Sequence, residues 1–181
     1  MPRMLAGIAA AALALAATSP ALAALKVGDK APEFTAKAAL AGKDFDFKLA
    51  KALKKGPVVL YFFPAAYTAG CTAEAHEFAE ATPEFEKLGA TVIGVTAGNV
   101  DRIKDFSKEH CRDKFAVAAA DATLVKSYDV VLSQKPEWSN RTSYVIAPDH
   151  KVLMAYTDGN FAGHVTQTMD AVKAYNAAHK K

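Results

Sequence analysis

The amino-acid sequence predicts an α/β domain in which helices cover both faces of a mixed central β-sheet. Two apolar runs, residues 57–63 and 91–96, have the length and the β-branched and aromatic content of strands that are buried on both faces. A helical pattern lies between them, and a strand-helix-strand unit of this kind forms a right-handed crossover with parallel strands. Residues 142–147 and 151–156 have the pattern of two strands joined by a Pro-Asp-His turn. This antiparallel hairpin would make the sheet mixed.

The elements before the first apolar run are expected to be short. Turn residues punctuate residues 24–43. Short strands are expected at Glu33–Ala36 and Phe45–Phe47, and a helical turn is expected at Leu49–Leu53.

The helix after the first apolar run is expected to extend from about Thr72 to Leu88. Its apolar side chains recur at helical spacing on one face, at Cys71, Ala75, Phe78, Phe85 and Leu88. Pro83 should kink this helix, and Gly89 is a natural C-terminal stop.

The remaining elements complete an alternating order of strands and helices. Asn99 is expected to cap a helix from Val100 to Cys111. A weak strand at Phe115–Ala119, a short helix at Ala122–Tyr128 and a last helix from Gly163 to Ala178 follow. A βαβ half joined to a ββα half is the thioredoxin-like plan. Residues 24–181 are therefore expected to form one such domain.

The N-terminus has the pattern of a secretory signal peptide. Arg3 gives a positive start, Leu5–Ala17 is an apolar run, and Ala21-Leu22-Ala23 is a small-x-small cleavage site. The sequence therefore predicts that residues 1–23 are removed by a cut after Ala23 and that the mature protein is periplasmic or secreted. The alternative is an uncleaved anchor, which is disfavoured because the apolar run is short for a membrane span.

Composition gives no sign of a nucleic-acid, membrane or metal partner. The 22 lysines and arginines nearly balance the 19 acidic residues, so nucleic acid is not suggested. Stable membrane association is not expected, and the alanine-rich surface does not distinguish a monomer from a homodimer. No ligand spacing supports a metal site, so the histidines are expected to be solvated; these are His76, His110, His150, His164 and His179.

The chain has two cysteines, Cys71 and Cys111. In an exported protein an even count suggests a structural disulfide. Cys71 also has features of a reactive thiol, because it stands where a buried strand gives way to a helix, and a helix N-terminus favours the thiolate. The third possibility is an ordinary buried core cysteine. A thiol-disulfide exchange enzyme is a further rival, but its Cys-x-x-Cys motif is absent from the sequence.

The residues around Cys71 suit a substrate that contains oxygen. Thr68 places a hydroxyl near the sulfur, where it can donate to a substrate oxygen. Pro64 offers no N–H and can shield the pocket from water, and Gly70 allows close approach of the backbone. Arg141 precedes a predicted strand and is the best-placed cation, because strand ends border such pockets.

Pro64, Thr68 and Cys71 make up a Pro-x-x-x-Thr-x-x-Cys signature, and with it the chain resembles the peroxiredoxins of the AhpC/TSA superfamily. Further similar segments are VGDKAPEF (27–34), PEFEKLGATVIGV (83–95) and RTSYVIAPDHKV (141–152). The segment CTAEAHEF (71–78) resembles the Q-type branch, also called bacterioferritin comigratory protein. The similarity extends over nearly the whole mature chain.

The resemblance implies a thiol peroxidase that needs no metal, haem or flavin cofactor. Cys71 would be the peroxidatic cysteine, which attacks hydrogen peroxide or an organic hydroperoxide and becomes a sulfenic acid. Thr68 and Arg141 would hold the peroxide while Pro64 shields the site. Glu74 would orient or pair with Arg141, or would only be a favourable acid in the first helical turn. A thioredoxin-like or other thiol would supply the electrons.

The chain departs from the Q-type pattern at the resolving cysteine. His76 occupies the position, five residues after Cys71, where many members have it. Other members carry it on the next helix, near Ser107, and Cys111 lies one turn beyond that position on the same face. Cys111 could therefore resolve the sulfenic acid in an atypical two-cysteine enzyme after local unwinding. The alternatives are a one-cysteine enzyme with a buried Cys111 and a non-enzymatic exported domain with a structural Cys71–Cys111 bridge.

Overall fold

The computed structural model describes residues 24–179. The predicted signal peptide and its cut after Ala23 lie outside the described residues and stay a prediction. The elements are, in chain order, β1 (Thr35–Leu40), β2 (Lys43–Lys48), α1 (Leu49–Leu53), β3 (Val58–Phe62), α2 (Ala69–Lys87), β4 (Thr91–Thr96), η1 (Val100–Arg102), α3 (Ile103–Glu109), β5 (Ala116–Ala119), α4 (Ala122–Ser127), β6 (Thr142–Ile146), β7 (Val152–Thr157) and α5 (His164–Ala178).

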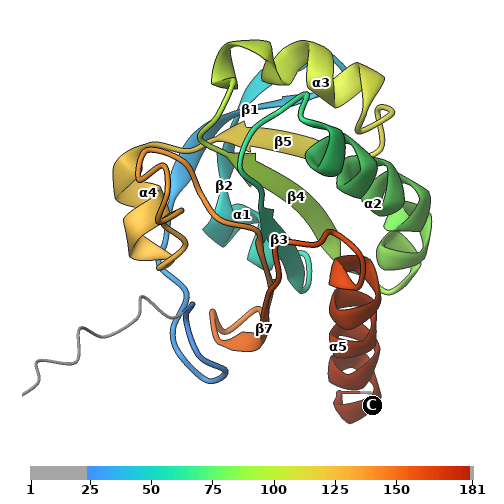
Figure 1. Cartoon of the computed structure of the whole chain (residues 1–181). Helices are drawn as coiled ribbons and strands as arrows, with labels where there is room; N and C mark the ends of the chain where they lie inside the picture. The colour runs from blue at the N-terminus through green and yellow to red at the C-terminus, as the bar shows by residue number, and fades with distance from the viewer. Residues whose placement is uncertain (1–23, 180–181) are drawn as a thin grey trace, which may run out of the picture.

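The strands form one seven-stranded sheet in the order β2-β1-β5-β4-β3-β6-β7. The strands β3, β4 and β5 are parallel neighbours, whereas β6 pairs antiparallel with β3 and β7 with β6. Helices α2, α3 and α5 cover one face, and α1 and α4 cover the other (Figure 1). The predicted α/β class with a mixed sheet and a thioredoxin-like plan is therefore confirmed.

Both faces of β3 are buried because its side chains alternate between two apolar clusters. Leu60 and Phe62 belong to the cluster under α1 and α4, and Val59 and Tyr61 belong to the cluster under α2. A strand with no polar face has no alternation of polar and apolar residues. This is why the continuous apolar run predicted the strand correctly.

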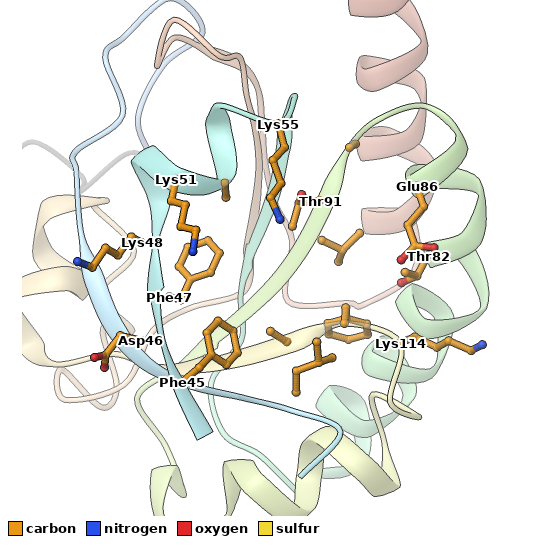
Figure 2. Close-up of a pocket in the computed structure, with 16 residues that line it drawn as sticks. Phe45, Asp46, Phe47, Lys48, Lys51, Lys55, Thr82, Glu86, Thr91 and Lys114 are labelled. Atoms are coloured by element: carbon orange, nitrogen blue, oxygen red, sulfur yellow. The ribbon is translucent and has the colours of Figure 1, made fainter. Parts of the chain in front are cut away.

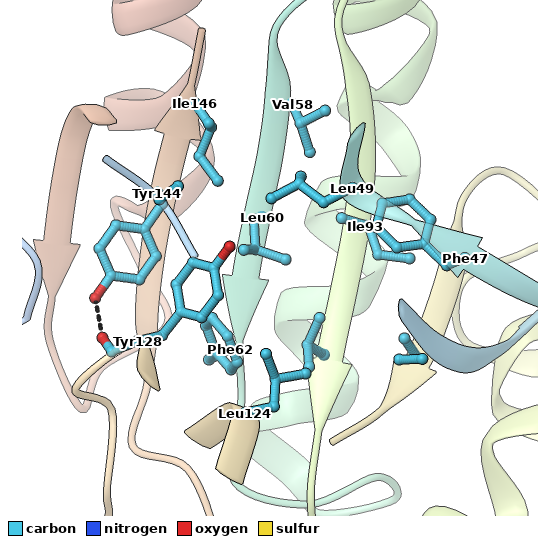
Figure 3. Packing of buried hydrophobic residues seen from close by; sticks show 14 of the residues in the cluster. Phe47, Leu49, Val58, Leu60, Phe62, Ile93, Leu124, Tyr128, Tyr144 and Ile146 are labelled. Atoms are coloured by element: carbon cyan, nitrogen blue, oxygen red, sulfur yellow. Dashed lines mark hydrogen bonds between the residues drawn. The ribbon is translucent and has the colours of Figure 1, made fainter. Parts of the chain in front are cut away.

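Tyrosine hydroxyls close the cluster under α1 and α4. Tyr144 donates to the carbonyl of Tyr128 at 2.7 Å (Figure 3). Tyr128 in turn donates to the carbonyl of Pro32 at 2.7 Å. These bonds satisfy the buried hydroxyls and tie the N-terminal segment to the sheet.

The two N-terminal strands are longer than expected. The structure places β1 at 35–40 instead of 33–36, and β2 at 43–48 instead of 45–47. The two strands pair with each other along their whole length, and β1 also pairs with β5. The pairing supplies backbone hydrogen bonds that these alanine- and lysine-rich residues do not reveal by themselves.

The helix expected from Val100 to Cys111 is shorter, and Asn99 does not cap it. The chain forms the 3-10 turn η1 and then α3, which ends at Glu109. Asn99 has a φ of 55° and donates from Nδ2 to the carbonyl of Ala66 at 2.7 Å. Its amide therefore anchors the loop before α2 instead of capping the next helix.

Helix α2 begins at Ala69, earlier than expected, and continues through Pro83 to Lys87. Gly89 ends it as predicted, with a φ of 73° and an N–H that donates to the Glu86 carbonyl at 2.9 Å. The early start places Cys71 inside the first turn of the helix.

Candidate active site

Cys71 lies in the first turn of α2, close after the carboxyl end of β3. The N–H of Thr72 donates to the carbonyl of Thr68 at 2.9 Å and makes the first bond of the helix. The N–H groups of the preceding helical residues therefore have no partner within the helix, and they favour negative charge at this end. Cys71 is only 2% exposed and is a free thiol. The first turn thus presents a shielded sulfur to the positive end of a helix.

The pairing of β6 with β3 brings Arg141 to Cys71. Thr142 pairs with Phe62 at the end of β3, so Arg141 stands where the loop to α2 begins. Its Nη2 lies 3.5 Å from the Sγ of Cys71. The cation that the sequence placed near the thiol is at hydrogen-bond distance from the sulfur.

The Arg141 guanidinium is held from two further sides. Nη1 donates to Oε2 of Glu74 in a buried ion pair, and Nε donates to the carbonyl of Gly159 at 3.1 Å. Burial opposes the positive charge, but Glu74 and Cys71 outweigh it, so the pKa of Arg141 is raised. The guanidinium therefore stays charged, with Nη2 directed at the sulfur.

Gly70 makes room for this arginine. A Cβ atom at Gly70 would lie 3.3 Å from Nη2 of Arg141, which is closer than ordinary van der Waals contact. The close approach expected at Gly70 is therefore present, and Arg141 is the residue that approaches it.

Thr68 and Pro64 border the outer side of the site. Thr68 is exposed, and its hydroxyl donates to the carbonyl of Ala65 at 3.1 Å without capping α2. The carbonyl of half-buried Pro64 accepts from Oγ1 of Thr96 at 3.2 Å. The loop is therefore fixed to the end of β4, and the Thr68 hydroxyl stands at the solvent side of the site.

A buried polar group of Glu74, Ser143 and His164 lies behind Arg141; in the sequence analysis Glu74 was named as a partner of Arg141, but the other two were missed. Glu74 and His164 are both 0% exposed, and Oε1 of Glu74 lies 3.7 Å from Nδ1 of His164. The same Nδ1 is 2.8 Å from Oγ of Ser143, and Nε2 is 3.1 Å from the carbonyl oxygen of Asp158. The expectation that His164 is solvated is wrong.

The sequence offers little warning of this group, because Glu74, Ser143 and His164 belong to three different elements, α2, β6 and α5. The one available signal is Ser143, a polar residue inside a buried strand. Burial raises the pKa of Glu74 to about 8 although Arg141 acts in the opposite direction. Burial also lowers the pKa of His164. Both shifts favour the uncharged forms.

Comparison with known proteins assigns the family. Residues 27–155 match the model of the AhpC/TSA family. The chain belongs to this family. Peroxiredoxin Bcp from Xanthomonas campestris is 29% identical over 126 residues, which are 65% of this chain and 77% of that protein. Chloroplastic peroxiredoxin Q from Triticum aestivum is 34% identical over 136 residues, which are 74% of this chain and 58% of that protein.

Solved peroxiredoxin structures have the same fold. Peroxidoxin BcpB from Mycobacterium tuberculosis has a TM-score of 0.73 at 29% identity, covering 83% of this chain and 97% of that one. A mutant PrxQ from Xylella fastidiosa has a TM-score of 0.73 at 25% identity, covering 85% and 99%. The resemblance inferred from Pro64, Thr68 and Cys71 is confirmed, and the chain is a peroxiredoxin enzyme, a thiol peroxidase by family. A non-enzymatic domain is not favoured.

The second cysteine of this peroxiredoxin, Cys111, lies beyond the end of α3 and not on the helix as expected. It is 0% exposed, and its N–H donates to the carbonyl of Phe106 at 3.0 Å. Burial raises the pKa of its thiol. The next residues, Arg112 and Asp113, have φ values of 50° and 58°, which helices do not contain. Cys111 is therefore a buried thiol in an irregular turn, and the described residues contain no Cys71–Cys111 disulfide.

His76, at the position where many Q-type relatives have the resolving cysteine, contacts the residue before Cys111. Its Nε2 lies 3.2 Å from Nδ1 of His110. Both histidines are half-buried and not freely solvated as expected. Burial and the neighbouring His76 lower the pKa of His110. The pair therefore links α2 to the turn that contains Cys111.

A cavity of about 400 Å³ lies away from this site (Figure 2). Thr91 at the start of β4 and Ala116 at the start of β5 line it, together with Phe45 and Phe47 of β2. Cys71 lies at the opposite end of the parallel strands, so this cavity is not the peroxide site.

Within residues 24–179 no helix is long and apolar enough to cross a membrane. The same part of the chain has no cluster of three or more histidine, cysteine or acidic side chains that could hold a metal ion.

Proposed function

We propose that this peroxiredoxin reduces hydrogen peroxide and organic hydroperoxides at Cys71. The observation that carries the proposal is the position of the Arg141 guanidinium, whose Nη2 lies 3.5 Å from the Sγ of Cys71 at the N-terminus of α2. A fixed cation and unpaired backbone N–H groups around one sulfur favour a thiolate. The same groups stabilise charge that develops on an oxygen bound beside that sulfur.

In the proposed reaction the Cys71 thiolate attacks one oxygen of the peroxide. A sulfur–oxygen bond forms while the O–O bond breaks, so the sulfur is oxidised to a sulfenate and the peroxide is reduced. The leaving oxygen takes the peroxide's own proton and departs as water or an alcohol. Arg141 and the Thr68 hydroxyl hold the oxygens, for which Thr68 turns away from the Ala65 carbonyl. Pro64 shields the sulfur.

We further propose that Cys111 resolves the sulfenic acid. Its thiol displaces the hydroxyl from the Cys71 sulfur, which yields a disulfide and water, and an external thioredoxin-like thiol then reduces the disulfide. Both cysteines belong to the apolar cluster under α2. Tyr61 belongs to the same cluster. The turn after α3 must unwind locally, because a disulfide needs Cα atoms within about 7 Å.

Peroxide consumption by the purified protein with dithiothreitol as reductant tests the proposed activity. We expect turnover of hydrogen peroxide and of cumene hydroperoxide by the parent protein and none by Cys71→Ser. Cys111→Ser is the matched control, because it also removes a buried thiol and should still consume one peroxide per chain in a single turnover. Turnover that survives in Cys71→Ser would overturn the proposal.

A further inference from the structure

The carboxyl group of Glu74 has one oxygen that the ion pair with Arg141 does not use. Oε2 accepts from Arg141, whereas Oε1 has no hydrogen-bond partner among residues 24–179 although it is buried. Nδ1 of His164 lies 3.7 Å from it. An unsatisfied carboxylate oxygen in a fully buried site is costly.

The partners of His164 fix where its hydrogen lies. Nε2 faces the carbonyl oxygen of Asp158, which can only accept, so Nε2 carries a hydrogen. Nδ1 faces the hydroxyl of Ser143 at 2.8 Å, and in the neutral ring it accepts from that hydroxyl. Oε1 of Glu74 lies 3.7 Å from the same Nδ1. Two acceptors so placed repel each other unless one of them carries a proton.

We propose that Glu74 and His164 hold one proton between them and that His164 is thereby a positioning residue for the contact between Arg141 and Cys71. The inference rests on the proposed peroxide reaction at Cys71. With the proton present, the Glu74–His164 pair has no net charge, so the full charge of Arg141 is available to the sulfur and the peroxide. When the proton is lost, a buried carboxylate competes for the same guanidinium.

The other groups around the pair are consistent with this proton. Burial raises the pKa of Glu74 to about 8, and the charge of Glu77 on the same helix adds to the rise. Burial lowers the pKa of His164, as does the charge of Arg141, whereas Asp158 acts in the opposite direction. The ring of Tyr156 from β7 packs edge-on against His164, with ring centroids 4.8 Å apart. At neutral pH the shared proton therefore resides mainly on Glu74.

The dependence of the single-turnover rate on pH tests the inference. For the parent protein we expect the rate with hydrogen peroxide to fall several-fold as pH rises through about 8, where Glu74 loses its proton. Glu74→Gln should remove this fall, because the amide has the shape of the acid and stays neutral. A merely structural role for Glu74 would not change the shape of the profile.

Two variants test the part played by His164. Ser143→Ala removes the hydroxyl that donates to Nδ1, so Nδ1 becomes a better acceptor for the proton on Glu74. The pH at which the single-turnover rate falls should therefore move upward by roughly one unit. His164→Leu removes Nδ1 as the partner of this proton, so the pH at which the rate falls should move in the opposite direction, downward. His179→Asn is the control, since His179 directly follows the same helix and is exposed, and it should leave the profile unchanged.

The proposal of a shared proton would be overturned if the parent rate stayed level above pH 8, or if the decrease in rate persisted in Glu74→Gln. The role of His164 would be overturned if the pH at which the rate decreases were the same in Ser143→Ala and His164→Leu as in the parent. If the parent does not react with peroxide, alkylation of Cys71 by iodoacetamide gives the same profile without the peroxidase reaction. The two proposals can therefore fail separately.

Discussion

At the scale of single residues, Arg141 contacts three groups that come from different parts of the chain: Cys71, Glu74 and the carbonyl of Gly159. A lysine has a single ammonium group in place of the planar guanidinium with its several N–H donors, so it cannot contact all three groups. Arg141→Lys should therefore slow the reaction with hydrogen peroxide roughly 10²-fold. It should also lower the free energy of unfolding by about 2 kcal/mol, because the buried carboxyl group of Glu74 would lose its hydrogen-bond donor. Stopped-flow kinetics and urea unfolding measure the two effects, and a parental rate would contradict the role given to Arg141.

Thr68 gives a prediction that separates chemistry from folding. Its side chain is exposed and, among residues 24–179, hydrogen-bonded only to the carbonyl of Ala65, so Thr68→Val should unfold at nearly the parental temperature. The peroxide rate should still fall by roughly 10²-fold, because a donor to the reacting oxygen is lost. Thr68→Ser keeps the hydroxyl and should retain most of the rate. Equal losses in both variants would show that the hydroxyl is not the active feature.

The site residues differed in how far the sequence could predict them. Pro64, Thr68 and Cys71 lie within one short segment, so their order and spacing alone carried the prediction. His164 could not be found this way, because the pairing of β6 with β3 and the packing of α5 bring it to Glu74. A solvated histidine and a buried one have the same sequence pattern when the partner is far along the chain.

At the scale of elements, Gly70 in the first turn of α2 has a low helix propensity but leaves room for the guanidinium of Arg141. Gly70→Ala should favour the helix by up to about 1 kcal/mol. The new Cβ would lie 3.3 Å from Nη2 of Arg141, so the guanidinium must shift by a few tenths of an ångström. We expect a melting temperature at or above that of the parent together with a peroxide rate lowered roughly tenfold. A more stable variant with an unchanged rate would show that the close approach at Gly70 has no role in catalysis.

The turn that follows α3 is expected to open when Cys111 reacts. Its backbone bonds include those from the N–H of Cys111 to Phe106, from the N–H of Asp113 to Ser107 and from the N–H of Lys114 to Cys111. In the parent protein, hydrogen exchange of residues 106–114 should become faster after treatment with peroxide, because forming the disulfide unwinds this segment. Cys111→Ser should show no such change. Unchanged protection in the oxidised parent would argue against Cys111 as the resolving thiol.

Elements were predictable where burial alone determines them. Strand β3 is apolar throughout and β4 is apolar between its two terminal threonines, and both were predicted at nearly their observed bounds. The bounds of β1 and β2 depend on pairing with each other. Asn99 was misassigned because its amide bonds to the loop before α2 instead of to its own helix. Such long-range hydrogen bonds leave no local pattern.

At the scale of the whole molecule, the sheet order converts distant sequence positions into one site. The parallel pair β3 and β4 directs the loop before Cys71 to one edge, and the antiparallel β6 returns the chain so that Arg141 reaches the same edge. The order of elements predicted this topology, because crossovers are right-handed and helices must cover both faces. Side-chain distances at the site follow from packing and could not be predicted from that order.

The intact mass of the reduced protein after one equivalent of hydrogen peroxide tests the central claim most directly. We predict that the parent loses two hydrogens, that Cys111→Ser gains one oxygen, and that Cys71→Ser is unchanged. A gain of one oxygen in the parent would keep Cys71 as the reacting thiol but contradict the role of Cys111. Thiols that stay unchanged for minutes in the parent, or an oxygen gained by Cys71→Ser, would contradict the claim that Cys71 reduces the peroxide.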